Sequence, residues 1–340
     1  MAYAIKKGSD YFDVTAYNGN SSSLSITTEF SPDFVWIKRR NTSGEHALFD
    51  TVRGRVYSLG TNSTNAEYTT SGADKDLISF DSTGYTVGQP NQRNVNGSGQ
   101  TYVGWSWRGS DSAAVENTDG SITSQVSANP TSGFSVVTYT GTGANATVGH
   151  GLGVAPSFII VKLYNTTGAW KNYHSSLGAT QAIEFTTGAS ATNSIYWNNT
   201  APTNSVFTAG TAGAINSSGN NHVAYCFAEV EGFSKFGSYT GNGSADGPFV
   251  YTGFRPAFVM VKQYTTTGNW IINDNGRAPY NLIPAALYPN LSNAEDSSHT
   301  MDLLSNGFKL RSTGDDSNGS GTGIIYMAFA ENPFKQSLAR

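Results

Sequence analysis

The chain has 340 residues, and its 20 Lys and Arg against 24 Asp and Glu give a net charge of -4. Only 13% of its residues are charged, which is low beside the roughly 25% of an ordinary soluble domain. The 18 Tyr, 18 Phe and 6 Trp supply enough apolar surface for a sizeable core, which excludes a disordered chain. Abundant Gly, Ser, Thr and Asn exclude a helical bundle, because these residues disfavour helix interiors.

The N-terminal residues 1–7 (MAYAIKK) are not followed by an apolar run, so we expect a protein that is made in the cytoplasm and does not insert into a membrane. The basic cluster Lys38-Arg39-Arg40 is the only one in the chain. It offers little to phosphates, so nucleic acid is not an expected partner. The single cysteine, Cys226, excludes an intramolecular disulfide, and its place in a strand pattern predicts a buried thiol.

One strand pattern occurs three times along the chain. Residues 32–38 read PDFVWIK, residues 156–162 read PSFIIVK and residues 256–262 read PAFVMVK. Further landmarks keep register with this strand: Tyr139-Thr140-Gly141 recurs at 239–241, and Trp170 recurs at Trp270, while His46 takes the place of the tryptophan in the first copy. Each copy ends in an apolar strand, at 102–107, 222–229 and 325–331.

These repeats, bounded by Gly- and Asn-rich turns, predict an all-β fold of three tandem β-sandwich modules of about 100 residues each. We place the first and most diverged repeat at 1–109, the second at 133–231 and the third at 232–335, with a C-terminal tail at 336–340. Residues 110–132 are rich in Ser, Ala, Asn and Asp. They predict either a linker or an extended strand between the first two repeats.

Catalytic and metal-binding motifs are weak in this sequence. The five histidines lack the paired spacing of a zinc site, and phosphate-binding, dinucleotide-binding and serine-nucleophile motifs are missing. The acidic turn at 315–319 (DDSNG) could offer oxygens to calcium, but we favour a solvated hairpin tip. Close acidic pairs occur, such as Glu229 with Glu231 and Asp74 with Asp76, but 24 acids produce such pairs without catalytic purpose. We therefore expect a protein that is not an enzyme and has no metal or cofactor.

Exposed aromatic rings beside amide side chains are the usual means of holding a sugar. The densest such group is Tyr196-Trp197-Asn198-Asn199, which we single out as the candidate ligand-binding site while leaving a core role for Tyr196 and Trp197 equally open. Trp170 and Trp270 are repeated at equivalent positions. Repetition favours a shared packing role for these two rings over a ligand specific to one repeat.

The segments 133–141 (GFSVVTYTG), 148–156 (VGHGLGVAP), 159–162, 221–232 (NHVAYCFAEVEG) and 328–335 (AFAENPFK) resemble a repeat of marine tailed bacteriophages. Proteins with this repeat are described as tail-fibre-like or lectin-like virion proteins. The resemblance spans nearly all of residues 112–335. It implies a component of the virus particle and a β-sandwich of the jelly-roll or lectin-like kind, and it carries over no catalytic residue. The chain departs from the longer fibre-like members in having no obvious anchoring domain or stalk before the first repeat.

Three functions follow as hypotheses. The first is a non-enzymatic virion protein, a fibre or appendage module whose Gly/Ser/Thr/Asn-rich loops contact a host-surface polysaccharide. The second is a capsid decoration or head-fibre protein that stabilises the particle through other virion proteins. The least favoured is a polysaccharide depolymerase. Three similar repeats in one chain suggest either a pseudo-trimeric monomer or, for a fibre, a homotrimer.

Overall fold

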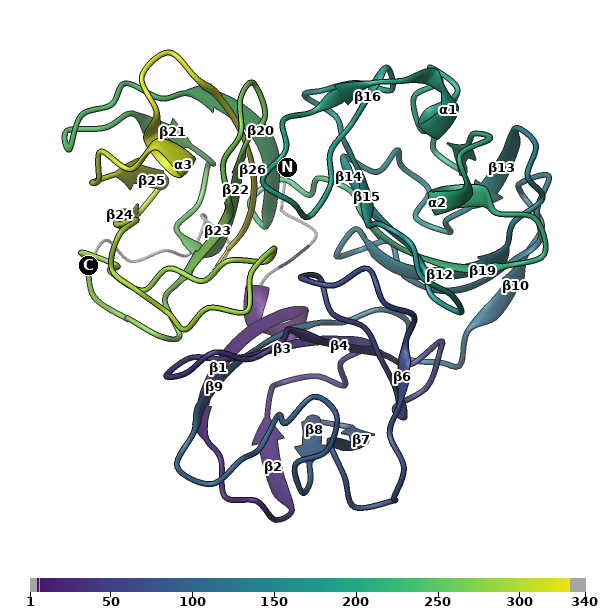
Figure 1. Cartoon of the computed structure of the whole chain (residues 1–340), viewed down its shortest axis with the longest axis horizontal. Helices are drawn as coiled ribbons and strands as arrows, with labels where there is room; N and C mark the ends of the chain where they lie inside the picture. The colour runs from purple at the N-terminus through teal and green to yellow at the C-terminus, as the bar shows by residue number, and fades with distance from the viewer. Residues whose placement is uncertain (1–4, 6, 331–340) are drawn as a thin grey trace.

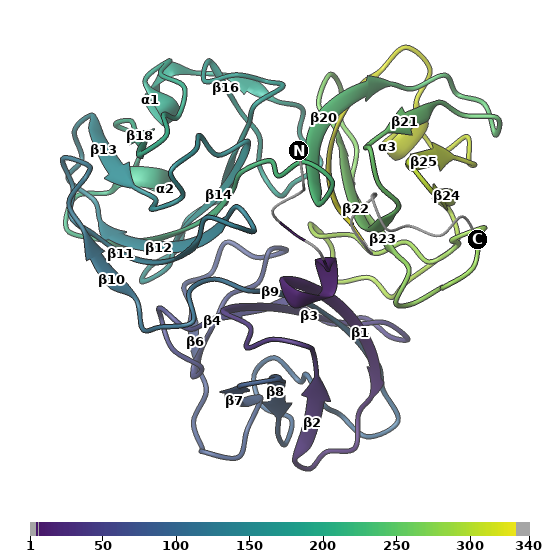
Figure 2. The ribbon, with the colours of Figure 1, turned by 180° about the vertical axis from the view of Figure 1, so that it is seen from behind.

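The computed structural model describes residues 5 and 7–330, and there the regular secondary structure is mainly antiparallel strands, joined by long loops. The predicted all-β class is confirmed. Figure 1 shows three lobes around a common centre, and Figure 2 shows the same arrangement from behind. The end of the third repeat and the tail predicted at 336–340 lie outside the described residues. No helix in the described part of the chain has the length and apolar character needed to cross a bilayer.

Each lobe contains a large sheet with the same order of four strands, in which the last strand of the repeat lies between the first and the third. All pairings within these sheets are antiparallel. The strands are β1 (Phe12–Asn18), β9 (Thr101–Trp107), β3 (Phe34–Arg39) and β4 (Ala47–Asp50); β12 (Phe134–Thr140), β19 (Asn221–Phe227), β14 (Phe158–Leu163) and β15 (Lys171–His174); and β20 (Ser234–Thr240), β26 (Gly323–Ala330), β22 (Pro256–Gln263) and β23 (Trp270–Asp274).

The segment at 110–132 contributes two strands, β10 (Val115–Asn117) and β11 (Ser124–Asn129), to the sheet of the second repeat. β11 pairs with β12, and β10 forms the outer edge. Of the two alternatives left open by its composition, the segment therefore takes the extended one, and it widens the second large sheet to six strands.

Smaller sheets pack against the outward side of the large ones, as expected for sandwiches. They comprise β2 (Leu24–Thr27), β8 (Gly84–Val87) and β7 (Leu77–Asp81) in the first repeat; β13 (Ala146–Gly149) and β18 (Val206–Ala209) in the second; and β21 (Phe249–Tyr251), β25 (Gly307–Leu310) and β24 (Met301–Leu304) in the third. The remaining elements are the short pairs β5 (Tyr57–Ser58) with β6 (Tyr68–Thr69) and β16 (Gln181–Ala182) with β17 (Ala191–Thr192), the 3-10 turn η1 (Gly8–Asp10), and the helical turns α1 (Ser194–Trp197), α2 (Gly213–Asn216) and α3 (Asp315–Asn318).

The third strand of every repeat is buried along its length rather than on alternate residues. Continuous burial means that both faces of the large sheet are covered. One face packs on the small sheet of its own repeat, and the other faces the centre of the molecule. The central cluster draws buried side chains from all three repeats. The lobes therefore share one core in addition to the interiors of the sandwiches.

An aromatic residue at or next to the end of each repeat's last strand meets its counterparts at the centre. The rings of Trp107 and Phe227 lie 6.0 Å apart, those of Phe227 and Phe329 also 6.0 Å, and those of Trp107 and Phe329 5.7 Å, all edge to face. These contacts form a triangle of equivalent aromatic residues. Edge-to-face pairs at such distances contribute about 0.5 to 1.5 kcal/mol each beyond the area they bury.

One buried asparagine per repeat fixes the loop that follows the first strand. The side-chain oxygen of Asn216 accepts the backbone N–H of Thr142 at 2.7 Å, and its amide donates to the carbonyl oxygen of Gly210 at 2.8 Å. Asn96 and Asn318 make matching bonds in the first and third repeats. The repeats thus share polar anchors as well as strand order.

Candidate functional site

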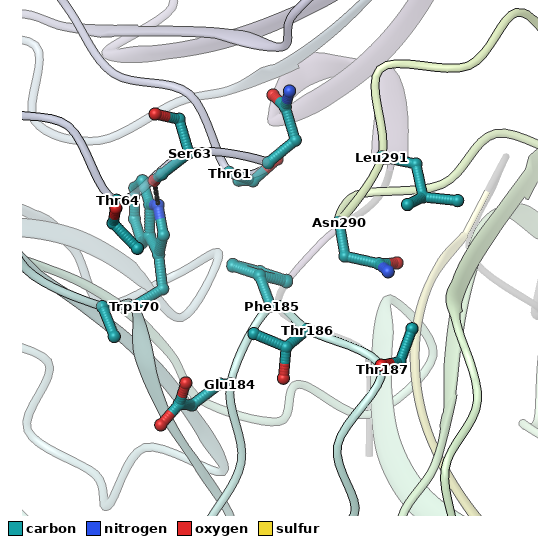
Figure 3. A pocket seen from close by; sticks show the side chains of 12 residues that line it. Thr61, Ser63, Thr64, Trp170, Glu184, Phe185, Thr186, Thr187, Asn290 and Leu291 are labelled. Atoms are coloured by element: carbon teal, nitrogen blue, oxygen red, sulfur yellow. Dashed lines mark hydrogen bonds between the residues drawn. The ribbon is translucent and has the colours of Figure 1, made fainter.

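A pocket of about 280 Å³ opens where loops of all three repeats converge on the centre of the molecule (Figure 3). Residues 61–64 come from the first repeat, residues 184–187 from the second, and residues 290 and 291 from the third, with Ala169 and Trp170 completing the wall. We call this the axial pocket. No single repeat could form it, because each supplies only a part of the lining.

Three buried lysines hold the converging loops in place. Lys162 Nζ donates to the carbonyl oxygen of Thr64 at 3.0 Å, and Lys262 Nζ donates to that of Thr187 at 3.2 Å. Lys38 closes the ring by donating to the carbonyl oxygens of Ser292 at 3.2 Å and Asn293 at 2.8 Å. Each lysine is the next-to-last residue of the third strand of one repeat, and it reaches the loop of another. The ring of contacts therefore closes on itself.

A backbone bond accompanies each lysine. Gly168 N–H donates to the Thr64 carbonyl, Gly268 N–H to that of Thr187 and Gly44 N–H to that of Ser292, each at 2.8 Å. Burial lowers the pKa of Lys38 to about 7, and it lowers the pKa of Lys162 and of Lys262 to about 8. The lysines therefore serve as hydrogen-bond donors to backbone oxygens, and none of the three presents a charge to the surface.

The floor of the axial pocket is aromatic. Trp170 Nε1 donates to the carbonyl oxygen of Gly60 at 2.9 Å, so the indole is anchored across the boundary between two repeats. Phe185 packs edge-on against Trp170 at 5.8 Å and lies 4.9 Å from the ring of Trp270. It also meets Trp36 of the first repeat at 6.1 Å. Phe185 thus closes the centre of the molecule beneath the pocket.

The walls are polar and mostly uncharged. Thr61 and Asn290 are committed to the scaffold, because Thr61 donates to the carbonyl of Pro289 at 2.6 Å and Asn290 accepts the N–H of Trp270 at 2.9 Å. Thr186 and Thr187 are exposed at the rim. Glu184 is the only ionisable residue of the lining, and it is paired with Lys171. An aromatic floor under hydroxyl and amide walls suits a neutral, hydroxylated ligand.

The four residues singled out from the sequence lie elsewhere, in and after α1. Trp197 is 2% exposed and packs edge-on against Tyr173 at 5.8 Å, so its ring belongs to the core. Tyr196 is half-buried beneath Lys171, whose Nζ lies 4.3 Å from its ring centre. Asn198 and Asn199 are exposed. Only Tyr196 is linked to the axial pocket, through the Lys171 that pairs with Glu184.

The repeated tryptophans have the packing role expected of them, since Trp170 and Trp270 are 2% and 1% exposed. His46 takes over their function in the first repeat. Its Nε2 donates to the carbonyl oxygen of Tyr288 at 2.9 Å, just as Trp270 Nε1 donates to that of Glu184 at 2.7 Å. Cys226 is buried, as predicted.

The acidic turn at 315–319 is not the solvated hairpin tip that we expected. Residues 315–318 form the helical turn α3, in which Ser317 and Asn318 are buried. The carboxylate of Asp316 accepts both the backbone N–H and the side-chain amide of Asn269, at 2.8 and 2.9 Å. Asp316 therefore holds a neighbouring loop. Within residues 5 and 7–330, no group of three His, Cys, Asp or Glu side chains is placed to hold a metal ion.

The acidic pairs noted in the sequence are also built into the scaffold. Asp76 is buried and accepts the backbone N–H groups of Asn91 and Arg93, at 3.0 and 3.3 Å. Glu229 pairs with Lys235 at 2.6 Å. Two residues of the basic cluster at 38–40 also have structural roles. Lys38 is buried, and Arg40 pairs with Glu295 of the third repeat at 2.8 Å.

Sequence reasoning missed the axial pocket, although one signal pointed toward it. Lysine ends the repeated seven-residue strand pattern in all three copies, and a charge repeated at one position of an apolar strand indicates a shared structural partner. Which loops the lysines reach depends on how the ring of lobes closes, and strand patterns do not contain that information.

Comparison with known proteins identifies a family for the chain and no function. A family model described as a domain of unknown function, DUF7483, matches residues 7–333 as one unit. No curated protein and no solved structure matches the chain. Since the match covers nearly the whole sequence, the chain belongs to the DUF7483 family.

Proposed function

We propose that this chain is a non-enzymatic component of a tailed-bacteriophage particle, an appendage or fibre module that binds a host-surface glycan in the axial pocket. The observation that supports the proposal is the lining of that pocket. Hydroxyl and amide groups surround the aromatic floor formed by Trp170 and Phe185, and the single carboxylate, Glu184, is already paired. Sugars offer both the apolar ring face and the hydroxyls that such a lining accommodates.

The rigidity of the site favours recognition over catalysis. The loops that carry the lining are tied to neighbouring repeats through Lys38, Lys162 and Lys262. A binding site that is held in place before the ligand arrives loses less conformational entropy on binding. Catalysis of glycoside hydrolysis needs two carboxyl groups facing one another, whereas Glu184 is the only carboxylate in this lining.

Binding can be tested with the purified chain and a panel of methyl glycosides of neutral hexoses and N-acetylhexosamines, using saturation-transfer NMR and calorimetry. We expect binding of at least one glycoside that is lost in Thr186→Trp, since Thr186 is exposed at the rim and a large ring there fills the opening. Thr131→Trp, at an exposed threonine in the turn between β11 and β12, is the matched control. Binding that survives Thr186→Trp, or no binding to any glycoside, contradicts the proposed site.

The place in the particle is tested separately, by labelling gradient-purified phage with an antibody against the chain in electron microscopy. Label at the tail or at a fibre supports the appendage, and particles without label contradict any virion role.

The second candidate function is a capsid decoration. The closed ring of equivalent lysine contacts favours it, because a pseudo-threefold chain matches a threefold position on a capsid. Label on the head would select this candidate.

A further inference from the structure

The exposed apolar side chains of the third repeat gather on one sheet face. Among the described residues, four of the seven exposed large hydrophobic side chains belong to this repeat: Phe249, Tyr251, Tyr280 and Leu282, which are 45%, 62%, 83% and 46% exposed. Phe249 and Tyr251 alternate with the buried Val250 on β21, so both point away from the sandwich interior. β21 is an edge strand of the sheet β21-β25-β24.

Tyr280 and Leu282 extend the same face at the opposite edge. Ile283 bridges Met301 of β24, and Asn281 exchanges hydrogen bonds with Leu303, donating to its carbonyl at 3.1 Å and accepting its N–H at 2.9 Å. Asn281 and Ile283 therefore lie beside β24, Ile283 through an antiparallel bridge and Asn281 through its side chain. Leu282 and Tyr280 are exposed at this edge. We call the outward surface of 280–283, β24, β25 and β21 the third outer face.

Two rows of side chains cross the third outer face, as the strand registers show. The first row is Asp302, Lys309 and Phe249. The second row is Leu304, Gly307 and Tyr251, and the exposed Tyr280 and Leu282 lie at the edge beyond β24. The face thus has an apolar flank at each edge, a charged pair of opposite sign in the first row, and a large residue beside a glycine in the second. The face lies on the outer side of its lobe, away from the other two lobes (Figure 1).

The corresponding face of the first repeat is hydrophilic. Gly84 of β8 pairs with Thr27 of β2 in the small sheet of the first repeat, and Gly307 of β25 pairs with Tyr251 of β21 in that of the third. The two glycines are therefore at equivalent positions. Aligned on these glycines, Ser25 and Thr27 occupy the positions of Phe249 and Tyr251, and Thr86 occupies that of Lys309. The outer apolar residues are therefore not needed by the fold. The first repeat forms the same small sheet without them.

The charges on the third outer face are balanced within it. Lys309 Nζ pairs with Asp246 at 2.9 Å, and Arg311 Nε pairs with Asp302 at 2.6 Å. A partner with a strong net charge of either sign would gain little there. Sugar hydroxyls would also find the central polar groups already engaged. A neutral surface with apolar flanks is suited to another protein surface of the same character.

We propose that the third outer face binds the same face of a second copy of this chain, around a twofold axis that runs parallel to the strands between β24 and β25. This axis exchanges the two edges of the sheet. It sets the edge that carries Phe249 and Tyr251 against the edge of the second copy that carries Tyr280 and Leu282. Lys309 then faces Asp302 of the second copy, and Leu304 lies over Gly307. Apolar residues meet apolar ones, unlike charges meet, and the large residue meets the small one. The face is self-complementary, as a twofold interface requires.

Molar mass by light scattering tests the proposal on the whole purified chain, whose monomer is 36.1 kDa. We expect twice this mass at high concentration, with dissociation over a roughly hundredfold dilution. The double variant Phe249→Ser/Tyr251→Thr carries the residues of the first repeat and removes one apolar flank. We expect it to raise the dimer dissociation constant on the order of thirtyfold or more.

The matched control is Val154→Ser/Ile195→Ser, which removes two exposed apolar side chains from the second repeat. It should leave the dimer unchanged, and circular dichroism should show that both double variants remain folded. A second variant, Lys309→Glu, sets like charges opposite Asp302 and should also weaken the dimer. A chain that stays monomeric at every concentration overturns the proposal. So does a dimer or trimer that survives both Phe249→Ser/Tyr251→Thr and Lys309→Glu.

Discussion

Lys162 Nζ lies 3.0 Å from the carbonyl oxygen of Thr64, and this contact joins the second repeat to the first. Lys262 joins the third repeat to the second, and Lys38 joins the first to the third. Units joined by head-to-tail contacts form an open chain unless the rotations between successive units add up to a full turn, which gives a closed ring. Here the ring closes within one chain, so each repeat is held by two neighbours.

Replacement of Lys162 by Met should lower the free energy of unfolding by about 1 to 3 kcal/mol, because a buried charged donor to two carbonyl oxygens is lost. Urea denaturation of the whole chain measures the change. Lys235→Met is the matched control, since Lys235 is partly exposed and paired only with Glu229; it should cost no more than about 1 kcal/mol. Equal effects of the two variants would show that the buried lysines do not support the ring.

The buried pair of Asp274 and Arg277 makes a second test of contacts between repeats. Asp274 accepts Arg277 Nε at 2.8 Å and also the indole N–H of Trp105 in the first repeat, at 3.0 Å. Asp274→Leu should cost about 3 to 5 kcal/mol, because it leaves the guanidinium buried without its nearest carboxylate. Asp274→Leu/Arg277→Leu should cost less than the single change. The second repeat already tolerates a leucine, Leu177, at the arginine position.

Thermal or urea melts of these variants decide the outcome. A double variant that is less stable than Asp274→Leu would mean that Arg277 contributes mainly through its other partners. These are Glu295, at 3.1 Å, and the carbonyl oxygen of Ile272, at 3.0 Å.

Much of the fold could be predicted because the repeated strands are apolar at fixed spacing. The strand that contains Phe158 and the strand that contains Phe258 were recognisable in the sequence, and so were the repeated Trp170 and Trp270. The substitution of His46 for tryptophan was also visible, and both side chains can donate a ring N–H to a backbone oxygen. Local patterns were sufficient for features that depend on strand order within one repeat.

The candidate site could not be predicted in the same way. The axial pocket exists only because loops roughly 100 residues or more apart meet, such as those carrying Thr64 and Thr187. Trp197 had a polar sequence context typical of an exposed site, yet it packs on Tyr173 in the core. A short helical turn such as α1 buries one side and exposes the next residues, and neither alternation nor composition determines which side faces inward.

The shared core predicts that the repeats do not unfold one at a time. Phe227→Ala removes one corner of the aromatic triangle with Trp107 and Phe329, and large-to-small changes of this kind cost about 3 to 5 kcal/mol. We expect one cooperative calorimetric transition that shifts as a whole to lower temperature in the variant. Phe80→Ala, on the small outer sheet of the first repeat, is a control that should shift it less. Two resolved transitions, of which only one moves, would argue against a common core.

The last prediction concerns pH. His174 is buried, its Nδ1 accepts the N–H of Ser176 at 3.1 Å, and its Nε2 donates to the carbonyl oxygen of Tyr326 at 3.1 Å. The bond from Ser176 requires the neutral ring, because a protonated Nδ1 cannot accept, and burial lowers the pKa of His174 to about 4. The unfolded chain, with a pKa near 6.5, therefore binds a proton that the folded chain does not. The stability that His174 contributes is complete above pH 6.5 and falls as the pH drops toward 4.

His174→Gln isolates this effect, because a glutamine amide can both accept from Ser176 and donate to Tyr326 but does not titrate. Urea melts between pH 7 and pH 4 should show the parent chain losing up to about 1.4 kcal/mol per pH unit relative to the variant. Above pH 7 the difference in stability should be constant. Parallel curves for the two proteins across the acidic range would mean that His174 is already protonated in the fold, with its bond to Ser176 broken.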